Sequence, residues 1–194
     1  QARLDAAGIT LRTAPDPIDA IWPDRPALPL RPIYAHRAPH APLPRAHKLA
    51  QVREAMVRLG ATHHFISSLD DIAWLSNLRG SDVAYNPVFV AHLLLDLTGA
   101  RLFVGASKVD DTLRDELAAD GVTLAPYDAA AAALGALGAN DVLLLDPRRS
   151  TLGFRQQVGP GCRVVEAITP STLLKSRKSE AEADQKRLTS HELF

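Results

Sequence analysis

Residues 109–145 read VDDTLRDELAADGVTLAPYDAAAAALGALGANDVLLL, and this stretch alternates helical with strand patterns. The expected elements are, in order, a helix marked by Val109, Leu113 and Leu117, a strand over residues 122–125, an alanine-rich helix over 129–137 and a strand over 142–145. Ser107, with Asp110 three residues on, is the expected start of the first helix. Strands that alternate with helices favour parallel pairing, because each returning helix packs on a face of the sheet.

An antiparallel hairpin is expected just before this stretch. The apolar run over residues 88–97 is followed by Thr98-Gly99-Ala100 and a second apolar run over 101–104, and a turn between two such runs predicts a hairpin. The remaining expected elements are a helix from Arg45 closed by Gly60, a strand over 63–67, a helix over 68–78 that begins at a capping box, a helix over 151–158, a strand over 163–165 and a charged helix over 175–187. The sequence therefore predicts an α/β fold with a mixed, mostly parallel sheet and helices on both faces.

Composition excludes several classes of partner. The chain has 194 residues, and its 22 Lys and Arg balance 22 Asp and Glu. A neutral chain lacks the electrostatic footprint that binds nucleic acid or an acidic membrane. The apolar run over residues 88–97 is too short to cross a bilayer, and the single Cys162 cannot form an internal disulfide. We therefore expect no nucleic-acid partner, no membrane partner and a cytoplasmic location.

The two ends of the chain differ from its middle. Residues 8–11 are compatible with a short strand and residues 18–22 with a turn of helix, and half of the fourteen prolines follow within residues 23–44. Proline lacks an N–H and favours extended neighbours, so this segment is expected to be a semi-rigid connector. Because the chain begins at Gln1 and its only methionine is Met56, we expect it to be a piece of a longer protein.

Three candidate sites favour structural roles. Adjacent residues on a strand point to opposite faces, so one zinc ion would not reach both His63 and His64. Cys162 follows a Gly-Pro-Gly turn and has no evident partner base, which favours a half-buried thiol over a nucleophile. Neither GxGxxG nor GxxxxGK[ST] occurs, and Gly138 is interpreted as a helix stop rather than part of a phosphate loop. The sequence therefore predicts no catalytic residue and no metal ligand in this chain.

The segment Asn77-Leu78-Arg79-Gly80-Ser81-Asp82 has two interpretations. In the first it is a helix terminus, with Arg79 near the exposed carbonyls and Gly80 in a left-handed cap. In the second it is a loop that presents Arg79 and Asp82 to a substrate or a neighbouring domain, because a guanidinium binds a carboxylate through two hydrogen bonds. Composition alone leaves both open.

Three motifs, taken together, resemble one family. Residues 72–83 read IAWLSNLRGSDV and residues 85–89 read YNPVF, and they closely resemble the signature WLxNLRGSDxxxNPVF of the large, three-domain Xaa-Pro aminopeptidases (aminopeptidase P). Residues 21–26, IWPDRP, resemble the WxDRP segment that leaves the first domain of that family. Pro170-Ser171 with Lys175 and residues 178–182 resemble its KxxKxxxE entry to the catalytic domain. The three motifs stand in the family's order and span about residues 20–182.

The resemblance implies a domain plan. Residues 1–24 would be the end of a preceding domain, 25–44 a proline-rich linker, 45–172 a creatinase-N-like middle domain, and 173–194 the start of a truncated catalytic domain. In the family, that third domain holds two Mn²⁺-like ions through two Asp, one His and two Glu. None of these ligands would lie in this chain. Residues 188–194 depart from the family pattern, which continues into an AHxRD-type segment.

The resemblance also implies a function. The domain would wall the active-site cleft of an enzyme that removes the residue before a penultimate proline, and it would contact the catalytic domain of the same or a neighbouring subunit. Arg79 and Asp82 would lie near the substrate peptide, while the fragment alone would be inactive. Two alternatives stay open: a binding module from a pseudo-peptidase without metal ligands, and a nucleotide-binding α/β domain, against which the missing phosphate loop argues.

Overall fold

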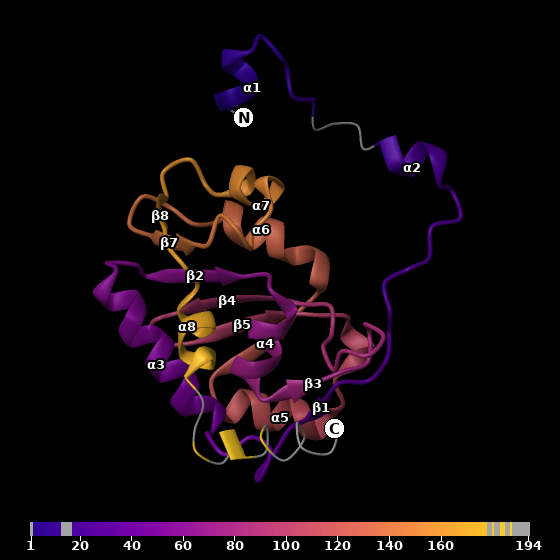
Figure 1. Cartoon of the computed structure of the whole chain (residues 1–194), viewed down its shortest axis with the longest axis vertical. Coiled ribbons are helices and arrows are strands. Elements are labelled where there is room, and N and C mark those ends of the chain that lie inside the picture. Colours follow the sequence, from indigo (N-terminus) through magenta and orange to yellow (C-terminus); the bar gives the residue numbers. More distant parts are fainter. Residues whose placement is uncertain (1, 13–16, 178–179, 181–182, 185–186, 188–194) are drawn as a thin grey trace.

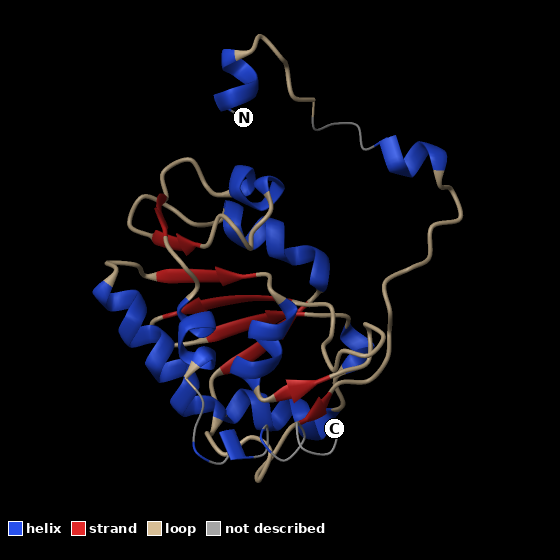
Figure 2. Ribbon diagram, viewed as in Figure 1, coloured by secondary structure: helices blue, strands red, loops and turns tan. Residues whose placement is uncertain are grey.

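The computed structural model describes residues 2–12, 17–177, 180, 183–184 and 187 and contains one six-stranded sheet (Figures 1 and 2). The strands are β2 (His63–Ile66), β4 (His92–Asp96), β5 (Ala100–Phe103), β6 (Val122–Ala125), β7 (Val142–Leu145) and β8 (Arg163–Glu166). Their order across the sheet is β6-β5-β4-β2-β7-β8. Three neighbouring pairs are parallel, and the pairs β2–β4 and β4–β5 are antiparallel. The mixed, mostly parallel sheet is confirmed.

Helices cover both faces of this sheet, as expected (Figure 1). One face carries α3 (Arg45–Arg58), α4 (Leu69–Ser76), α5 (Asp111–Ala119) and α8 (Pro170–Ser176), and the other carries α6 (Ala130–Gly135) and α7 (Leu152–Gln157). Alternate strand residues supply the two apolar cores, because successive side chains point to opposite faces. In β7, Leu144 joins the α3/α4/α5/α8 core, whereas Leu143 and Leu145 join the α6/α7 core.

The predicted hairpin is present, but its first strand is shorter than the apolar run. β4 begins at His92, and the preceding residues turn back against the loop that follows α4. The amide of Gly80 donates to the Pro87 carbonyl at 3.4 Å, and that of Asp82 donates to Val88 at 3.2 Å. The carbonyls of Pro87 and Val88 therefore accept hydrogen bonds from the loop and not from a neighbouring strand of the sheet. For this reason β4 does not extend back to residue 88.

Two helix ends differ from expectation. α5 does not begin at Ser107, because residues 106–108 form a short 3₁₀ turn and Asp110 is the N-cap, whose carboxylate accepts from the Leu113 amide at 2.8 Å. Asp110 is therefore the N-cap of α5, and not the partner of an N-cap at Ser107. α6 ends at Gly135, not Gly138, whose amide instead donates to the Asp141 carboxylate at 2.8 Å.

α1 (Ala2–Ala6) and α2 (Pro17–Ile21) lie away from the sheet, and the connector that follows α2 returns beside the ends of the strands (Figure 1). Residues 8–11 form no strand. The proline-rich connector reaches the body at β1 (Tyr34–Ala35), which pairs antiparallel with β3 (Leu78–Arg79). A two-residue edge strand is compatible with a proline-rich segment, because few N–H groups are needed.

The charged helix expected over residues 175–187 agrees in part: the described residues 180, 183–184 and 187 are helical, but a separate helix, α8, precedes them. α8 starts at Pro170, where a proline fits the first helical turn, and ends at Ser176. Part of the KxxKxxxE motif and all of residues 188–194 lie outside the described residues. Within the described ranges, no helix combines the length and the apolar character that crossing a bilayer requires.

Candidate functional site

The loop over residues 77–90 follows α4 and contains both predicted substrate-proximal residues. α4 ends because Asn77 adopts a left-handed conformation with φ of 52°, so the helix does not continue to Leu78. The expectation that Gly80 forms this cap was wrong: Asn77 takes that role, which its short polar side chain allows. That side chain donates to the Leu43 carbonyl at 2.8 Å and accepts from Lys48 at 2.6 Å.

Gly80 is needed for space rather than for a left-handed backbone. A β-carbon at this position would lie 2.8 Å from the Phe89 β-carbon and 3.2 Å from the Val88 carbonyl oxygen. Phe89 is itself fully buried. The two sides of the loop therefore pack against each other at Gly80, and the stem of the loop is rigid.

Asp82 is held inside this stem. Its side chain is 0% exposed and forms an ion pair with Lys108, which is 2% exposed. The same carboxylate oxygen accepts from the Val90 amide at 2.7 Å. Lys108 also donates to the Pro29 carbonyl at 3.3 Å, so the pair joins the loop to the proline-rich connector. Lys108 was not singled out in the sequence, because its partner lies 26 residues away and no local pattern connects them.

Arg79 lies at the base of the loop on β3 and is half-buried. Its Nη1 donates to the carbonyls of Ala73, in α4, and Leu78 at 2.9 and 2.8 Å, so the guanidinium does reach the helix end as the first interpretation expected. Among the described residues, no carboxylate lies within ion-pair distance of it. Burial lowers the pKa of Arg79, and nearby Tyr34 opposes this effect. Arg79 is therefore a partly desolvated cation that no carboxylate in the described part of the chain neutralises.

The tip of the loop carries an exposed aromatic side chain. Val83 and Asn86 form a β-bridge, and Tyr85 between them is fully exposed with φ of 60°. This conformation is unfavourable for a bulky residue and persists only where the surrounding structure imposes it. Tyr85 lies inside the quoted motif, but the sequence carries no signal of its backbone conformation.

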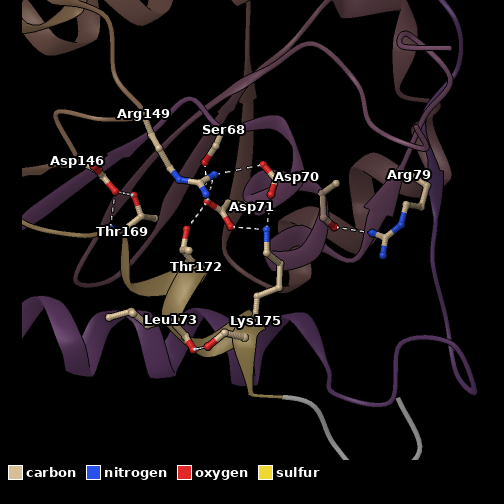
Figure 3. Close-up of polar contacts among 12 residues, drawn as sticks. Ser68, Asp70, Asp71, Arg79, Asp146, Arg149, Thr169, Thr172, Leu173 and Lys175 are labelled. Atoms are coloured by element: carbon tan, nitrogen blue, oxygen red, sulfur yellow. Dashed lines mark hydrogen bonds and ion pairs between the residues drawn. The ribbon is translucent and has the colours of Figure 1, made fainter. Parts of the chain in front are cut away.

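A cluster of charges lies where α4 begins and α8 packs beside it (Figure 3). The Asp71 side chain is 0% exposed and forms an ion pair with Lys175 of α8 at 2.7 Å. Its second oxygen accepts from Ser68 at 2.6 Å and Thr172 at 2.7 Å, and Arg149 lies 3.4 Å from it. We call these five residues the α4–α8 clasp.

Asp70, the neighbour of Asp71, helps to stabilise the charged form of Lys175. Lys175 also forms an ion pair with Asp70. Burial opposes the charge on Lys175, yet its hydrogen bonds to Asp70 and Asp71 raise its pKa above the ordinary value. Burial likewise opposes the charge on Asp70, while its hydrogen bond to Lys175 lowers the pKa of that carboxyl. The two shifts agree in favouring the ionised pair.

The other candidates occupy structural environments. His63 is half-exposed beside Asp141, whereas His64 is fully buried and contacts the Leu144 carbonyl at 3.0 Å through Nδ1. Burial lowers the pKa of His64 to about 4. The Cys162 thiol is half-buried, and burial raises its pKa, which disfavours the thiolate.

Metal-binding side chains do not gather in the part of the chain that the structure describes. No three His, Cys, Asp or Glu side chains there lie close enough together to hold an ion. The clasp residue Asp71 and its neighbour Asp70 supply two carboxylates, but Lys175 and Arg149 occupy the positions that a cation would take. The described residues therefore do not fit a dinuclear metal centre.

The fold and the loop define a class of protein. The sheet order, the helices on both faces and the motif loop define an α/β domain with a mixed, mostly parallel sheet. The family model of the creatinase/prolidase N-terminal domain matches residues 24–182, and the chain belongs to this family.

Curated relatives carry the name that the motifs predicted. The chain is 42% identical over 132 residues to aminopeptidase P2 of Arabidopsis thaliana, which covers 67% of this chain and 19% of that protein. It is 30% identical over 194 residues to a probable Xaa-Pro aminopeptidase P of Coccidioides posadasii, with 94% of this chain and 31% of that protein covered. The chain thus spans less than a third of these relatives. The resemblance to Xaa-Pro aminopeptidases is confirmed.

A solved structure shows the same fold. The X-prolyl aminopeptidase of Caenorhabditis elegans, described as a cytosolic enzyme with a di-nuclear active site, superposes with a TM-score of 0.81. The match covers 94% of this chain and 31% of that one at 23% identity. At this identity the match supports the fold alone.

Proposed function

We propose that this chain is a non-catalytic N-terminal and middle portion of an Xaa-Pro aminopeptidase, an enzyme that removes the residue before a penultimate proline. The proposed division is residues 1–24 as the end of a preceding domain, 25–44 as linker, 45–172 as the middle domain and 173–194 as the start of the catalytic domain. In this proposal the middle domain walls the active-site cleft and restricts entry to the free N-terminus of a peptide. Its location would be the cytoplasm.

The observation that carries the proposal is the state of Arg79. Its guanidinium is half-buried, fixed by two carbonyls through Nη1, and lacks a carboxylate partner among the described residues. A partly desolvated cation costs free energy, and folded proteins retain such groups at functional sites. We propose that its remaining N–H donors bind a carbonyl or carboxylate of the substrate peptide.

Asp82 has an indirect part in this proposal. Its carboxylate binds Lys108 and the Val90 amide. In this proposal Asp82 therefore fixes the loop beside the substrate and does not contact the substrate itself. The two Mn²⁺-like ions implied by the resemblance would be held outside the described residues, and no step of the reaction is assigned to this chain. The partner would be the catalytic domain of the same or a neighbouring subunit.

The first test measures peptidase activity of the purified 194-residue chain with Mn²⁺ and an Xaa-Pro peptide. We expect no hydrolysis above the buffer rate, because the described residues provide no metal centre. Turnover comparable to that of an aminopeptidase would overturn the proposal. Sequencing the gene beyond Phe194 distinguishes an active aminopeptidase from the pseudo-peptidase alternative. An active enzyme requires two Asp, one His and two Glu as metal ligands downstream, and a pseudo-peptidase lacks them.

The second test uses the longer protein that the proposal requires. Replacing Arg79→Met removes the charge, and Arg79→Lys keeps the charge but loses the planar fork. We expect both variants to raise KM, by about tenfold or more for Met, as for loss of a charge-assisted hydrogen bond. The matched control is Arg155→Met, which removes an exposed arginine on α7. An unchanged KM in Arg79→Met would exclude substrate contact.

A further inference from the structure

The α4–α8 clasp and Arg79 are joined through one short helix (Figure 3). We propose that Lys175 and Asp71 are positioning residues for Arg79, so that the orientation of α8 sets the position of its guanidinium. The functional meaning of this coupling rests on the proposed role of Arg79, but the coupling itself is a property of the folded chain.

The first link is electrostatic and joins α8 to α4. Asp71 is fully buried and depends on Lys175 at 2.7 Å and the Thr172 hydroxyl at 2.7 Å, both supplied by α8. A buried carboxylate must keep such partners, because unpaired burial is costly. Displacement of α8 therefore moves Asp71 or breaks its contacts.

The second link is α4 itself. The helix has eight residues, so it is about 12 Å long and behaves as a rigid rod at this length. The carbonyl of Ala73, two residues after Asp71, accepts from Arg79 Nη1 at 2.9 Å. A shift at the start of the helix is thus transmitted to the group that orients Arg79.

A third observation ties the far end of α4 to the same unit. The Arg45 Nε donates to the Ser76 carbonyl at 2.5 Å, and Lys48 donates to the Trp74 carbonyl at 2.9 Å. Both are residues of α3, which also packs against α8. The three helices therefore hold Arg79 as one unit, and Lys175 and Thr172 connect α8 to the first turn of α4.

The position of α8 gives this coupling its significance. The match to the family model ends at residue 182, shortly after α8, and the chain spans less than a third of the length of its relatives. A following domain that moved α8 would change how Arg79 is presented. Asp71 also stabilises the first turn of α4 through the helix dipole. If that were its whole role, a change in α8 would not affect Arg79.

The test follows the Nη1–H signal of Arg79, the group that donates to the Ala73 and Leu78 carbonyls, by nuclear magnetic resonance in the ¹⁵N-labelled 194-residue chain. In Lys175→Met we expect this signal to shift and its hydrogen exchange to become about tenfold faster, as for weakening of one hydrogen bond to a charged group. Lys175→Arg keeps the charge and is expected to retain most of the original signal. Arg155→Met, on the opposite face, is expected to leave it unchanged.

Two outcomes decide the question without substrate or metal. If the amides around Asp71 shift in Lys175→Met while the Arg79 signal stays fixed, the coupling is absent and the clasp is only a local contact. If Lys175→Met does not fold, Thr172→Val removes a single hydroxyl contact to Asp71, and the same two signals are read. Because no peptidase activity is measured, this test can fail while the proposed function stands, and the reverse also holds.

Discussion

The two faces of the sheet are built from different chemistry. The α3/α4/α5/α8 face buries charged and polar groups that include Arg45, Lys48, His64 and Asp71. The α6/α7 face is apolar and aromatic, with Phe65, Phe154 and Tyr127 around His92 at ring separations of 4.6–5.5 Å. Apolar packing stabilises a fold without directional demands, whereas buried charges impose specific partners. The difference indicates that the first face fixes the position of the loop over residues 77–90 and that the second mainly supplies stability.

Phe65→Ala gives the largest expected effect and tests the apolar face. Phe65 is 1% exposed, so its truncation leaves a cavity and lowers the free energy of unfolding by about 3–5 kcal/mol. Urea denaturation measures this loss. The Arg79 Nη1–H signal is expected to stay unchanged in the folded variant, and a large shift would show that the two faces are not separate.

His64 tests the polar face through pH. Burial holds its folded-state pKa at about 4, below the ordinary value of 6.5, so the unfolded chain takes up the proton first as pH falls. The stability from neutral His64 is complete above pH 6.5 and is lost towards pH 4, by about 3 kcal/mol in total. His64→Asn keeps a donor near the Leu144 carbonyl and is expected to flatten this dependence in urea titrations. The exposed His47→Asn is the control and is expected to keep the wild-type slope.

Gly80→Ala tests the rigid stem of the loop. The added methyl group would lie 2.8 Å from the Phe89 β-carbon. We expect overpacking to lower the free energy of unfolding by about 1–3 kcal/mol and to shift the Arg79 and Asp82 amide signals. Gly153→Ala has a nearest contact of 3.7 Å and serves as the control. Equal effects of the two substitutions would contradict close packing at Gly80.

Tyr85→Asn gives the smallest expected effect on stability. Tyr85 is exposed with φ of 60°, a conformation that asparagine adopts more readily. The variant is expected to be more stable by about 0.5–1 kcal/mol in thermal unfolding, because strain is relieved and no packing is lost. A loss of stability would mean that the Tyr85 ring makes contacts that its exposure does not show.

The sequence predicted the regular elements well where local pattern is sufficient. The strand over 142–145 and the helix–strand alternation around it follow from apolar periodicity, and they are confirmed. Errors occurred where two signals competed. Ser107 and Asp110 are both residue types that cap helices. Val109, which lies between them, is buried and has an extended backbone, so the helix begins after it and Asp110 is the N-cap. Asn77 and Gly80 both tolerate a left-handed backbone, but only Asn77 adopts it. Gly80 is required because Phe89 packs too closely for a side chain at that position.

The candidate site divides in the same way. The amino-acid order alone determined the α/β class, the motif loop with Arg79 and the family, because these depend on residues that are neighbours along the chain. Only the tertiary structure decided that Lys108 neutralises Asp82, that Lys175 joins Asp71, and that Arg79 has no carboxylate near it among the described residues. Those pairings join residues 26 and 104 positions apart, and the Coulomb attraction and desolvation that select them depend on distances that exist only after the chain has folded.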